Sequence, residues 1–268
     1  MTKNVVSSLW RSLPAAVNSK IEACIDAAMD RAGSTAPVYV FFRADDVGVP
    51  SEQFARLMDL FSRHQVPLSL AIVPAWLSRP RWQNLRKLGQ RSPALWCWHH
   101  HGWRHVNHEP FGKKQEFGPC RPLSGIRSDL TKGRSRLENL LDNDFCPVFT
   151  PPWNRCDIRT LELLKAFGYR AVSRNQGSLP PSPAGLSDFS VNIDLHTRKE
   201  VNPATGWERL FTEIDQAVSS GLCGIMIHHR KMNDLSFTFV EILLQILRRR
   251  KDLFLVHLGD LVRIFPNP

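Results

Sequence analysis

Residues 38–48 read VYVFFRADDVG, a run of β-branched and aromatic residues that leads directly into the acidic pair Asp45 and Asp46. Runs of this kind are typical of a strand buried on both faces. The pattern returns along the chain, and longer segments with apolar residues at helical spacing lie between the runs. Such alternation predicts a parallel sheet with helices packed outside it, and seven or eight units fit a closed β/α barrel. We therefore predict an α/β fold, a distorted (β/α)7-type barrel.

The expected elements follow from the same pattern. The expected strands cover residues 38–43, 67–73, 94–98, 147–150, 169–173, 189–194, 223–227 and 253–258. The expected helices cover about residues 51–64, 80–90, 124–142, 157–167, 206–220 and 236–250. Leu13, Val17, Ile21, Cys24 and Ile25 have helical spacing, which predicts an additional amphipathic helix at the N-terminus. We interpret residues 1–268 as a single domain, in which residues 1–36 form a helical extension packed on the barrel.

Composition excludes several classes of protein. The chain has 268 residues, of which 43% are hydrophobic and 22% charged, so it is neither disordered nor of low complexity. Its longest apolar runs are far shorter than a membrane-spanning helix of about 20 residues. The first thirty residues mix charges and lack an apolar signal core, so we expect a cytoplasmic protein. The six cysteines form no C-x-x-C pair, and we expect buried, reduced thiols.

The net charge of +10 raises the question of an acidic partner. The basic residues are dispersed along the chain, apart from the run Arg248-Arg249-Arg250-Lys251, and none of the usual nucleic-acid-binding motifs is present in the sequence. We therefore expect no nucleic-acid partner.

Polar and ionisable residues gather where the expected strands end. Asp45 and Asp46 follow the first strand, and His99, His100 and His101 follow the third. Residues 151–154, with the sequence PPWN, follow the fourth strand, and His228 and His229 follow the penultimate one. Because the carboxyl ends of barrel strands share one face, we expect the chemistry of the protein at that face.

The histidines indicate a metal site. Five of the ten, at positions 99, 100, 101, 105 and 108, lie within ten residues. His101 and His105 are four residues apart, so on one helical turn both side chains would face the same way and could share a metal. Asp46 is the natural carboxylate ligand, and Asp45 beside it would serve as general base. The other three histidines are expected to be structural or to support the ligands.

With these residues in order, the sequence resembles the polysaccharide deacetylase superfamily, whose members are metal-dependent carbohydrate esterases with a NodB-like barrel. The family carries an Asp-Asp pair after its first strand, an H-x-x-x-H motif, a proline-containing groove motif and a late strand that ends in histidine. The matching segments are residues 44–48 (ADDVG), 101–105 (HGWRH), 150–153 (TPPW) and 225–228 (IMIH). The matches span residues 38 to about 258 in the family's order.

The resemblance implies roles for individual residues. Asp45 would be the general base, and Asp46, His101 and His105 would bind a divalent metal, usually Zn²⁺, although Co²⁺, Ni²⁺ or Fe²⁺ would fit the same ligands. His228 would be the general acid that protonates the leaving amine, with His229 as the alternative. The backbone N–H of Trp153 would help to hold the oxyanion.

The sequence also departs from the family pattern. Thr150 replaces the arginine that usually begins the groove motif and pairs with the base. We expect Arg43, Arg121 or Arg155 to substitute for it. Asp194 either orients His228 or caps a loop.

Further residues are expected to bind substrate. Trp103 and Trp153 offer aromatic faces for a sugar ring, whereas Trp76, Trp96 and Trp98 are expected in the core. Glu116 and Arg121 either contact substrate or form an ion pair on a surface loop. The expected substrate-binding set is Trp153, Pro152, Asn154, Trp103, Glu116 and Arg121.

These observations favour a metal-dependent hydrolase that removes an acetyl or other acyl group from an N-acylated sugar or related amide. Two alternatives stay open: a catalytically silent carbohydrate-binding barrel, and a metal hydrolase of a different ester or amide bond. The expected partner is a small-molecule or oligosaccharide N-acyl substrate, and the sequence leaves the oligomeric state open.

Overall fold

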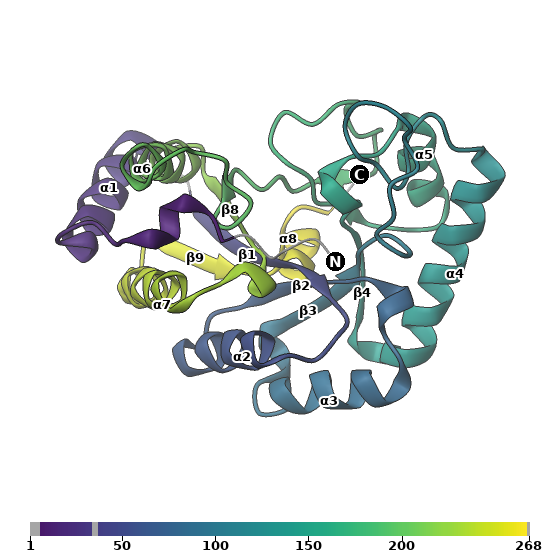
Figure 1. Ribbon diagram of the computed structural model, residues 1–268, viewed down its shortest axis with the longest axis horizontal. Helices are drawn as coiled ribbons and strands as arrows, with labels where there is room; N and C mark the ends of the chain where they lie inside the picture. Colours follow the sequence, from purple (N-terminus) through teal and green to yellow (C-terminus); the bar gives the residue numbers. More distant parts are fainter. Residues whose placement is uncertain (1–5, 34–36, 267–268) are drawn as a thin grey trace. The chain divides into compact units, whose positions relative to one another are not determined.

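Parallel strands and covering helices make up the chain, as the computed structural model shows for residues 6–33 and 37–266 (Figure 1). It divides into two compact units. The first comprises residues 1–44, 51–68 and 192–256, and the second comprises residues 45–50, 69–191 and 257–268. Strand β1 (Val38–Val47) belongs to both, because the boundary falls between Ala44 and Asp45.

The first unit is built around β1. Strand β8 (Leu222–Ile227) pairs with it in parallel, from Tyr39 opposite Leu222 to Ala44 opposite Ile227. Strand β9 (Leu253–Val256) also pairs with β1 in parallel, and β7 (Ile193–Asp194) pairs with β8. Apolar side chains along β1 and β8 are buried, so this sheet forms the core of the unit.

Helices cover this sheet. The helical segments of the first unit are η1 (Ser8–Arg11), α1 (Val17–Ala32), α2 (Glu52–His64), α6 (Pro203–Ser219), η6 (His229–Lys231) and α7 (Asp234–Arg249). Helix α1 lies beside α6 and buries Val17, Ile21 and Ile25, which confirms the amphipathic N-terminal helix (Figure 1). The side chains of Ser51, Asn202 and Asn233 cap α2, α6 and α7 by accepting hydrogen bonds from backbone N–H groups of the first turn.

The second unit holds five parallel strands in the order β6-β5-β4-β3-β2. They are β2 (Leu68–Ile72), β3 (Trp96–His100), β4 (Phe145–Phe149), β5 (Ala171–Val172) and β6 (Ser187–Asp188). The helical segments are η2 (Pro74–Trp76), α3 (Arg79–Gly89), η3 (Pro93–Leu95), α4 (Leu123–Leu141), η4 (Asp142–Asp144), η5 (Pro152–Asn154), α5 (Ile158–Ala166) and α8 (Leu258–Ile264).

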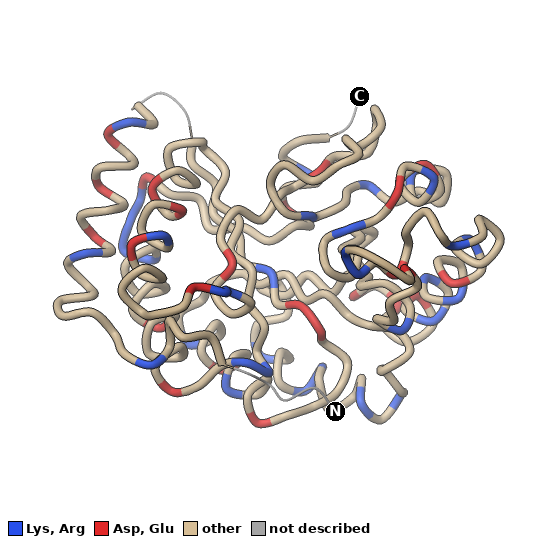
Figure 2. The backbone as a smooth tube through the Cα atoms, turned by 45° about the horizontal axis from the view of Figure 1, so that its top comes forward, with Lys and Arg blue, Asp and Glu red and all other residues tan. Residues whose placement is uncertain are grey.

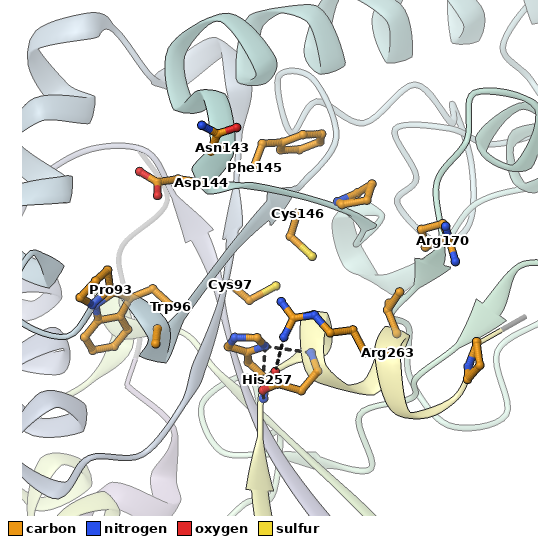
Figure 3. Close-up of a pocket in the computed structure, with 16 residues that line it drawn as sticks. Pro93, Trp96, Cys97, Asn143, Asp144, Phe145, Cys146, Arg170, His257 and Arg263 are labelled. Carbon is orange, nitrogen blue, oxygen red and sulfur yellow. Dashed lines mark hydrogen bonds and ion pairs between the residues drawn. The ribbon is translucent and has the colours of Figure 1, made fainter.

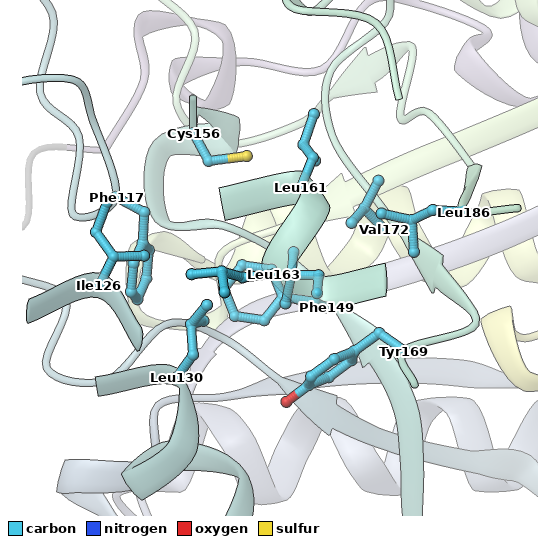
Figure 4. Packing of buried hydrophobic residues seen from close by; sticks show 11 residues of the cluster. Phe117, Ile126, Leu130, Phe149, Cys156, Leu161, Leu163, Tyr169, Val172 and Leu186 are labelled. Carbon is cyan, nitrogen blue, oxygen red and sulfur yellow. The ribbon is translucent and has the colours of Figure 1, made fainter. Parts of the chain in front are cut away.

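A cluster of buried apolar side chains fixes the position of β4 (Figure 4). Phe149 of β4 and Val172 of β5 pack in it with Leu130 of α4 and Leu161 of α5. Thr150, which follows Phe149 directly, is held by the same packing at the carboxyl end of β4.

The expected helices are all present, within three residues of their expected bounds, but several strand predictions were wrong in extent. Strand β3 begins and ends two residues later than expected, because the 3-10 turn η3 uses Pro93, Ala94 and Leu95. The strand expected over residues 189–194 is replaced by β7 alone, preceded by the short β6. Helix α8 was not predicted, because its Leu258 and Leu261 continue the apolar run of β9.

Acidic residues lie among the basic ones all along the chain (Figure 2). Many of them form ion pairs, including Arg63 with Glu241 and Arg86 with Asp144. In the described part of the chain, no helix has the length and hydropathy needed to cross a membrane.

Candidate metal and catalytic site

Asp45 and Asp46 lie within the last three residues of β1 rather than after it. The strand continues to Val47 because the carbonyl of Val47 accepts a hydrogen bond from Val73 N at 2.8 Å. Asp46 has a left-handed backbone with φ of 62°, whereas Asp45 is almost fully buried, with 3% of its surface exposed. The two neighbouring carboxylates therefore occupy different environments.

The structure brings together the three residues predicted to bind a metal. One ligand atom from each of Asp46, His101 and His105 lies within 4.8 Å of the other two. Asp46 Oδ1 is 3.4 Å from His101 Nε2 and 3.2 Å from His105 Nε2. In a tetrahedral zinc site with bonds of about 2.1 Å, neighbouring ligand atoms lie about 3.4 Å apart. The separations from Asp46 fit a divalent metal of this size.

A backbone carbonyl orients His101. Its Nδ1 lies 2.9 Å from the carbonyl oxygen of Thr150, which can only accept a hydrogen bond, so Nδ1 carries the proton. In the neutral ring, Nε2 then presents its lone pair toward the Asp46 carboxylate. Either a cation bound between them or a proton on Nε2 would make this contact favourable, and although burial lowers the pKa of His101, Asp46 accordingly raises it. A metal-binding histidine is held in the same way, through its second ring nitrogen.

His105 reaches the same point without a helix, so the prediction of one helical turn over residues 101–105 was wrong. These residues form an irregular loop, in which His105 has φ of 58°. Gly102 begins the loop with φ of 66°, and a Cβ there would lie 2.1 Å from Glu116 Oε2 and 2.5 Å from Pro152 Cγ. The loop therefore folds tightly over Glu116 and Pro152, and this brings His105 back toward His101.

Glu116 holds that loop. Its carboxylate is fully buried and accepts hydrogen bonds from Trp103 N at 3.2 Å and Arg104 N at 2.7 Å. Burial raises the pKa of Glu116, and the two backbone donors oppose this effect. Glu116 therefore positions the loop between the two histidines, and its burial rules out the surface ion pair, whereas its contact with substrate stays a prediction.

The pKa values of the two histidines respond to opposite influences. Burial lowers the pKa of His101, but Asp46 and Asp45 outweigh it and raise the pKa overall. Burial, together with the neighbouring His101, lowers the pKa of His105 to about 4. The carboxylates thus favour a positive charge at His101, and His105 stays neutral, the form that binds a metal.

The neighbouring histidines are structural, as expected. His99 Nε2 lies 2.9 Å from Thr150 Oγ1, and His100 Nε2 donates to the carbonyl of Gly102 at 2.6 Å. Burial lowers the pKa of His100 to about 3, so its ring is neutral. Gly133 of α4 makes room for that ring, because a Cβ there would lie 2.4 Å from His100 Nε2.

Aromatic rings surround His105. The ring centre of Trp153 lies 4.4 Å from the ring centre of His105, and the ring centre of Trp76 lies 5.9 Å from it. Trp153 has φ of 56°, in the left-handed region. A cavity of about 480 Å³ beside these residues is lined by Ala75, Trp76, Trp103, Arg104 and Arg136. We expected Trp76 in the core, and its partial exposure beside Trp103 was missed, although its place just after a strand was a signal.

The remaining predicted residues of the second unit have structural partners. Arg121 forms an ion pair with Asp129, and Arg155 donates to the carbonyl of Lys114 at 3.4 Å. Pro152 and Asn154 are buried in η5, where Asn154 N donates to Pro151 O at 2.9 Å. Their roles toward substrate stay predictions, as does the replacement of the family's arginine.

In the first unit, His228 and His229 differ in exposure. His228 is half-buried, whereas His229 is 1% exposed and packs edge-on against Phe54, with ring centres 5.2 Å apart. Arg43 is buried, and its Nη2 lies 3.1 Å from Met226 Sδ. Of the two histidines, His228 is the more accessible to a substrate.

His196 is a residue that the sequence analysis missed. Its Nδ1 accepts a hydrogen bond from the backbone N of His228 at 3.3 Å, and its ring stacks on Trp10 at 5.6 Å. Asp194 accepts hydrogen bonds from the backbone N–H groups of His196 and Thr197, so it caps this turn. A histidine two residues beyond a strand-ending aspartate was the available signal.

Comparison with known proteins identifies the fold. No protein-family model and no curated protein sequence matches the chain, but solved structures do. A protein from Mycobacterium smegmatis assigned as a polysaccharide deacetylase matches with a TM-score of 0.65 and 15% identity, over 87% of this chain and 96% of that one. A family 4 acetyl xylan esterase from Clostridium thermocellum, in complex with a cobalt ion, matches with a TM-score of 0.53 and 13% identity, over 86% and 93%.

A third match is a CE4 family pseudoenzyme from Bacillus anthracis, with a TM-score of 0.50 and 11% identity, over 86% of this chain and 66% of that one. At such identities the likeness establishes the fold alone. It confirms the expected distorted β/α barrel and the resemblance to polysaccharide deacetylases at the level of the fold.

Proposed function

We propose, on the premise that this chain has the fold of the polysaccharide deacetylases, that it is a metal-dependent hydrolase. The bond it would cleave joins an acyl group, acetyl in the simplest case, to the nitrogen of a sugar or a related amide. The observation that carries the proposal is the convergence of ligand atoms from Asp46, His101 and His105 within 4.8 Å.

These three residues would hold a divalent metal. When bound there, such an ion polarises the carbonyl group of the substrate and makes a water molecule more acidic. One carboxylate and two imidazoles suit Zn²⁺, and they also suit Co²⁺, Ni²⁺ or Fe²⁺. The hydrogen bond from His101 Nδ1 to Thr150 O supports this role, because it fixes the ring in the ligand orientation.

Other residues would move protons in the proposed reaction. Asp45, beside the ligand Asp46, would accept a proton from the attacking water. His228 would donate a proton to the leaving nitrogen, a role taken from the sequence resemblance and supported by the greater exposure of His228 than of His229. The backbone N–H of Trp153 would donate to the developing oxyanion.

The aromatic cavity beside His105 would bind the sugar. Trp76 and Trp103 supply flat apolar faces, and Arg104 supplies hydrogen-bond donors for hydroxyl groups. An N-acylated sugar bound there would lie next to the metal ligands, since the ring of Trp76 is 5.9 Å from that of His105.

Elemental analysis tests the metal site directly. Protein purified without chelator or histidine tag should contain close to one metal per chain, and the His101→Ala/His105→Ala variant should contain none. His108→Ala is the matched control, because His108 is an exposed histidine of the same segment. Protein that stays metal-free after incubation with zinc would overturn the proposal and favour a silent binding barrel.

Activity on the proposed bond needs a second measurement. The metal-loaded protein should release acetate from N-acetylated sugars, and Asp45→Asn should retain the metal while losing the activity. Hydrolysis of O-acetyl esters without hydrolysis of N-acetyl amides would instead identify a metal hydrolase of a different bond.

The sequence predicts a cytoplasmic protein, and we propose that the protein acts in the cytoplasm. There the substrate would be a soluble or membrane-linked precursor rather than a mature cell-wall polymer. Fractionation of the cells that make the protein tests this, and its recovery outside the cytoplasm would contradict it.

A further inference from the structure

A second cavity lies at the amino ends of β3 and β4 (Figure 3). The candidate metal ligand His101 follows the opposite, carboxyl end of β3. Its volume is about 790 Å³, within the range of sites for small organic molecules. Residues from β3, β4 and α8 line it, among them Cys97, Cys146 and Arg263. The proposed hydrolase function uses none of these residues.

Two thiols meet in this cavity. Cys97 on β3 and Cys146 on the neighbouring parallel strand β4 point toward each other (Figure 3), and a thiol–thiol interaction between them shifts the pKa of each. Cys97 is buried, with 3% exposed, whereas Cys146 is half-buried and lines the cavity. Helix α8 packs directly against Cys146, because a Cβ at Gly259 would lie in van der Waals contact with Cys146 Sγ, at 3.4 Å. The arrangement places one accessible thiol against one enclosed thiol.

The surroundings shift the pKa values of the two thiols in opposite directions. The hydrogen bond with Cys97 lowers the pKa of Cys146 and Arg263 reinforces this effect, whereas burial and Asp260, the ion-pair partner of Arg263, oppose it. The same hydrogen bond and burial raise the pKa of Cys97, so Cys97 keeps its proton and donates it toward Cys146. Cys146 is therefore the thiol of the pair that ionises first, and the thiolate is the nucleophilic form.

The four other cysteines, all within the described residues, lack this combination. Cys156 and Cys223 are buried, and burial raises the pKa of each to about 12. Cys120 is exposed, but its interaction with Glu109 raises its pKa. Burial raises the pKa of Cys24. Cys146, in contrast, lines a cavity and has a lowered pKa.

We propose that this cavity is a thiol-modification site, at which Cys146 undergoes exchange with small disulfides. The Cys146 thiolate attacks one sulfur of the disulfide, and a new bond forms between that sulfur and Cys146 Sγ. The disulfide bond of the small molecule breaks, and its second half leaves as a thiolate that takes a proton from water. Cys97 stays a thiol and acts as the hydrogen-bond donor that stabilises the Cys146 thiolate.

Incubation with glutathione disulfide tests the site, followed by intact-mass measurement and peptide mapping. The parent protein for all comparisons is the Cys120→Ser variant, which removes the fully exposed thiol. One glutathione adduct is expected, on Cys146, and Cys146→Ser should abolish it. A parent protein that remains unmodified at Cys146, or that is modified first at another cysteine, would overturn the proposal.

A pair of variants tests the role of Cys97. Cys97→Ala removes the donor and should slow the exchange at neutral pH by about threefold for each unit by which the pKa of Cys146 rises. Cys97→Ser keeps an O–H donor and should restore most of the rate. Equal rates in the two variants would show that Cys97 does not activate Cys146. Metal content, measured in parallel, reports on the proposed hydrolase site separately.

Discussion

Gly102 occupies the tightest turn of the histidine loop, where both its backbone angle and its contacts oppose a side chain. Gly102→Ala should lower the free energy of unfolding, because the new Cβ would need the space held by Glu116 Oε2 and Pro152 Cγ. Gly177→Ala is the matched control, since Gly177 also has positive φ, 71°, but no atom within 4 Å of the added Cβ.

Denaturant unfolding gives the free energy of unfolding of both variants, and the difference between them is the cost of the steric overlap at Gly102. The control should lose about 1 kcal/mol from backbone strain, and Gly102→Ala should lose about 1–3 kcal/mol more from overpacking. Equal losses in the two variants would contradict the tight packing of the loop. Gly102→Ala should also weaken metal binding, because the loop sets the position of His105.

His196 should make stability depend on pH. Burial lowers its pKa to about 3 in the folded chain, below the ordinary value of 6.5 that applies when the chain is unfolded. Between these values the unfolded state binds more protons, so the free energy of unfolding falls as the pH falls from 6.5 toward 3. The contribution is at most about 1.4 kcal/mol per pH unit.

Comparison with His196→Asn isolates this effect, because asparagine can still accept the hydrogen bond from His228 N but does not titrate. Chemical unfolding of both proteins across this pH range should give a shallower dependence for the variant. Identical slopes would show that His196 is not buried in its neutral form.

At the scale of single residues, the sequence predicted the candidate metal ligands well, because Asp46, His101 and His105 are distinctive by type and order. It did not predict how His105 reaches the site. His105 has positive φ in a loop that folds tightly over Glu116 and Pro152, and Glu116 lies outside the local sequence pattern. Tertiary contacts of this kind leave no periodic signal in a sequence.

Among the elements, α7 depends on Asn233, the residue that caps its N-terminus. Asn233 Oδ1 accepts a hydrogen bond from Ser236 N at 3.0 Å, and Asn233 Nδ2 donates to the carbonyl of Trp10 at 2.8 Å. Asn233→Ala should lower the free energy of unfolding by about 2 kcal/mol, because both interactions are lost. Asn233→Asp keeps the cap and should lose about half as much. Thermal or denaturant unfolding checks this, and equal losses would contradict a separate contribution from the cap.

Helices were predicted better than strands. A helix of ten or more residues repeats its apolar period several times, as α2 and α7 do, and Ser51 and Asn233 mark their starts. Strands β5, β6 and β7 have two residues each, too few for any period. Their positions are set by pairing with neighbouring strands, which one chain's local sequence does not record.

For the whole molecule, a metal bound to the folded state alone should stabilise it. At a free concentration about 1,000 times the dissociation constant, the gain is about 4 kcal/mol. Treatment with a chelator should therefore lower the thermal midpoint, and added zinc should restore it. His108→Ala should respond like the wild type, whereas a response in the His101→Ala/His105→Ala variant would place the metal elsewhere.

The net charge of +10 makes a second prediction at this scale. Acidic residues are interspersed among the basic ones along the chain (Figure 2), so any binding to nucleic acid should be weak and disappear as salt approaches physiological concentration. A gel-shift titration checks this, and a complex that persists at that salt concentration would contradict it.

The left-handed backbones of Asp46, His105 and Trp153 set stability against function in this chain. Bulky residues in that conformation are strained, at a cost of about 1–3 kcal/mol each, and glycine would relieve the strain. In a lineage released from its function, mutation toward glycine at these positions would be favoured by stability alone. This chain has an aspartate, a histidine and a tryptophan there, and backbone strain of this kind is characteristic of functional sites.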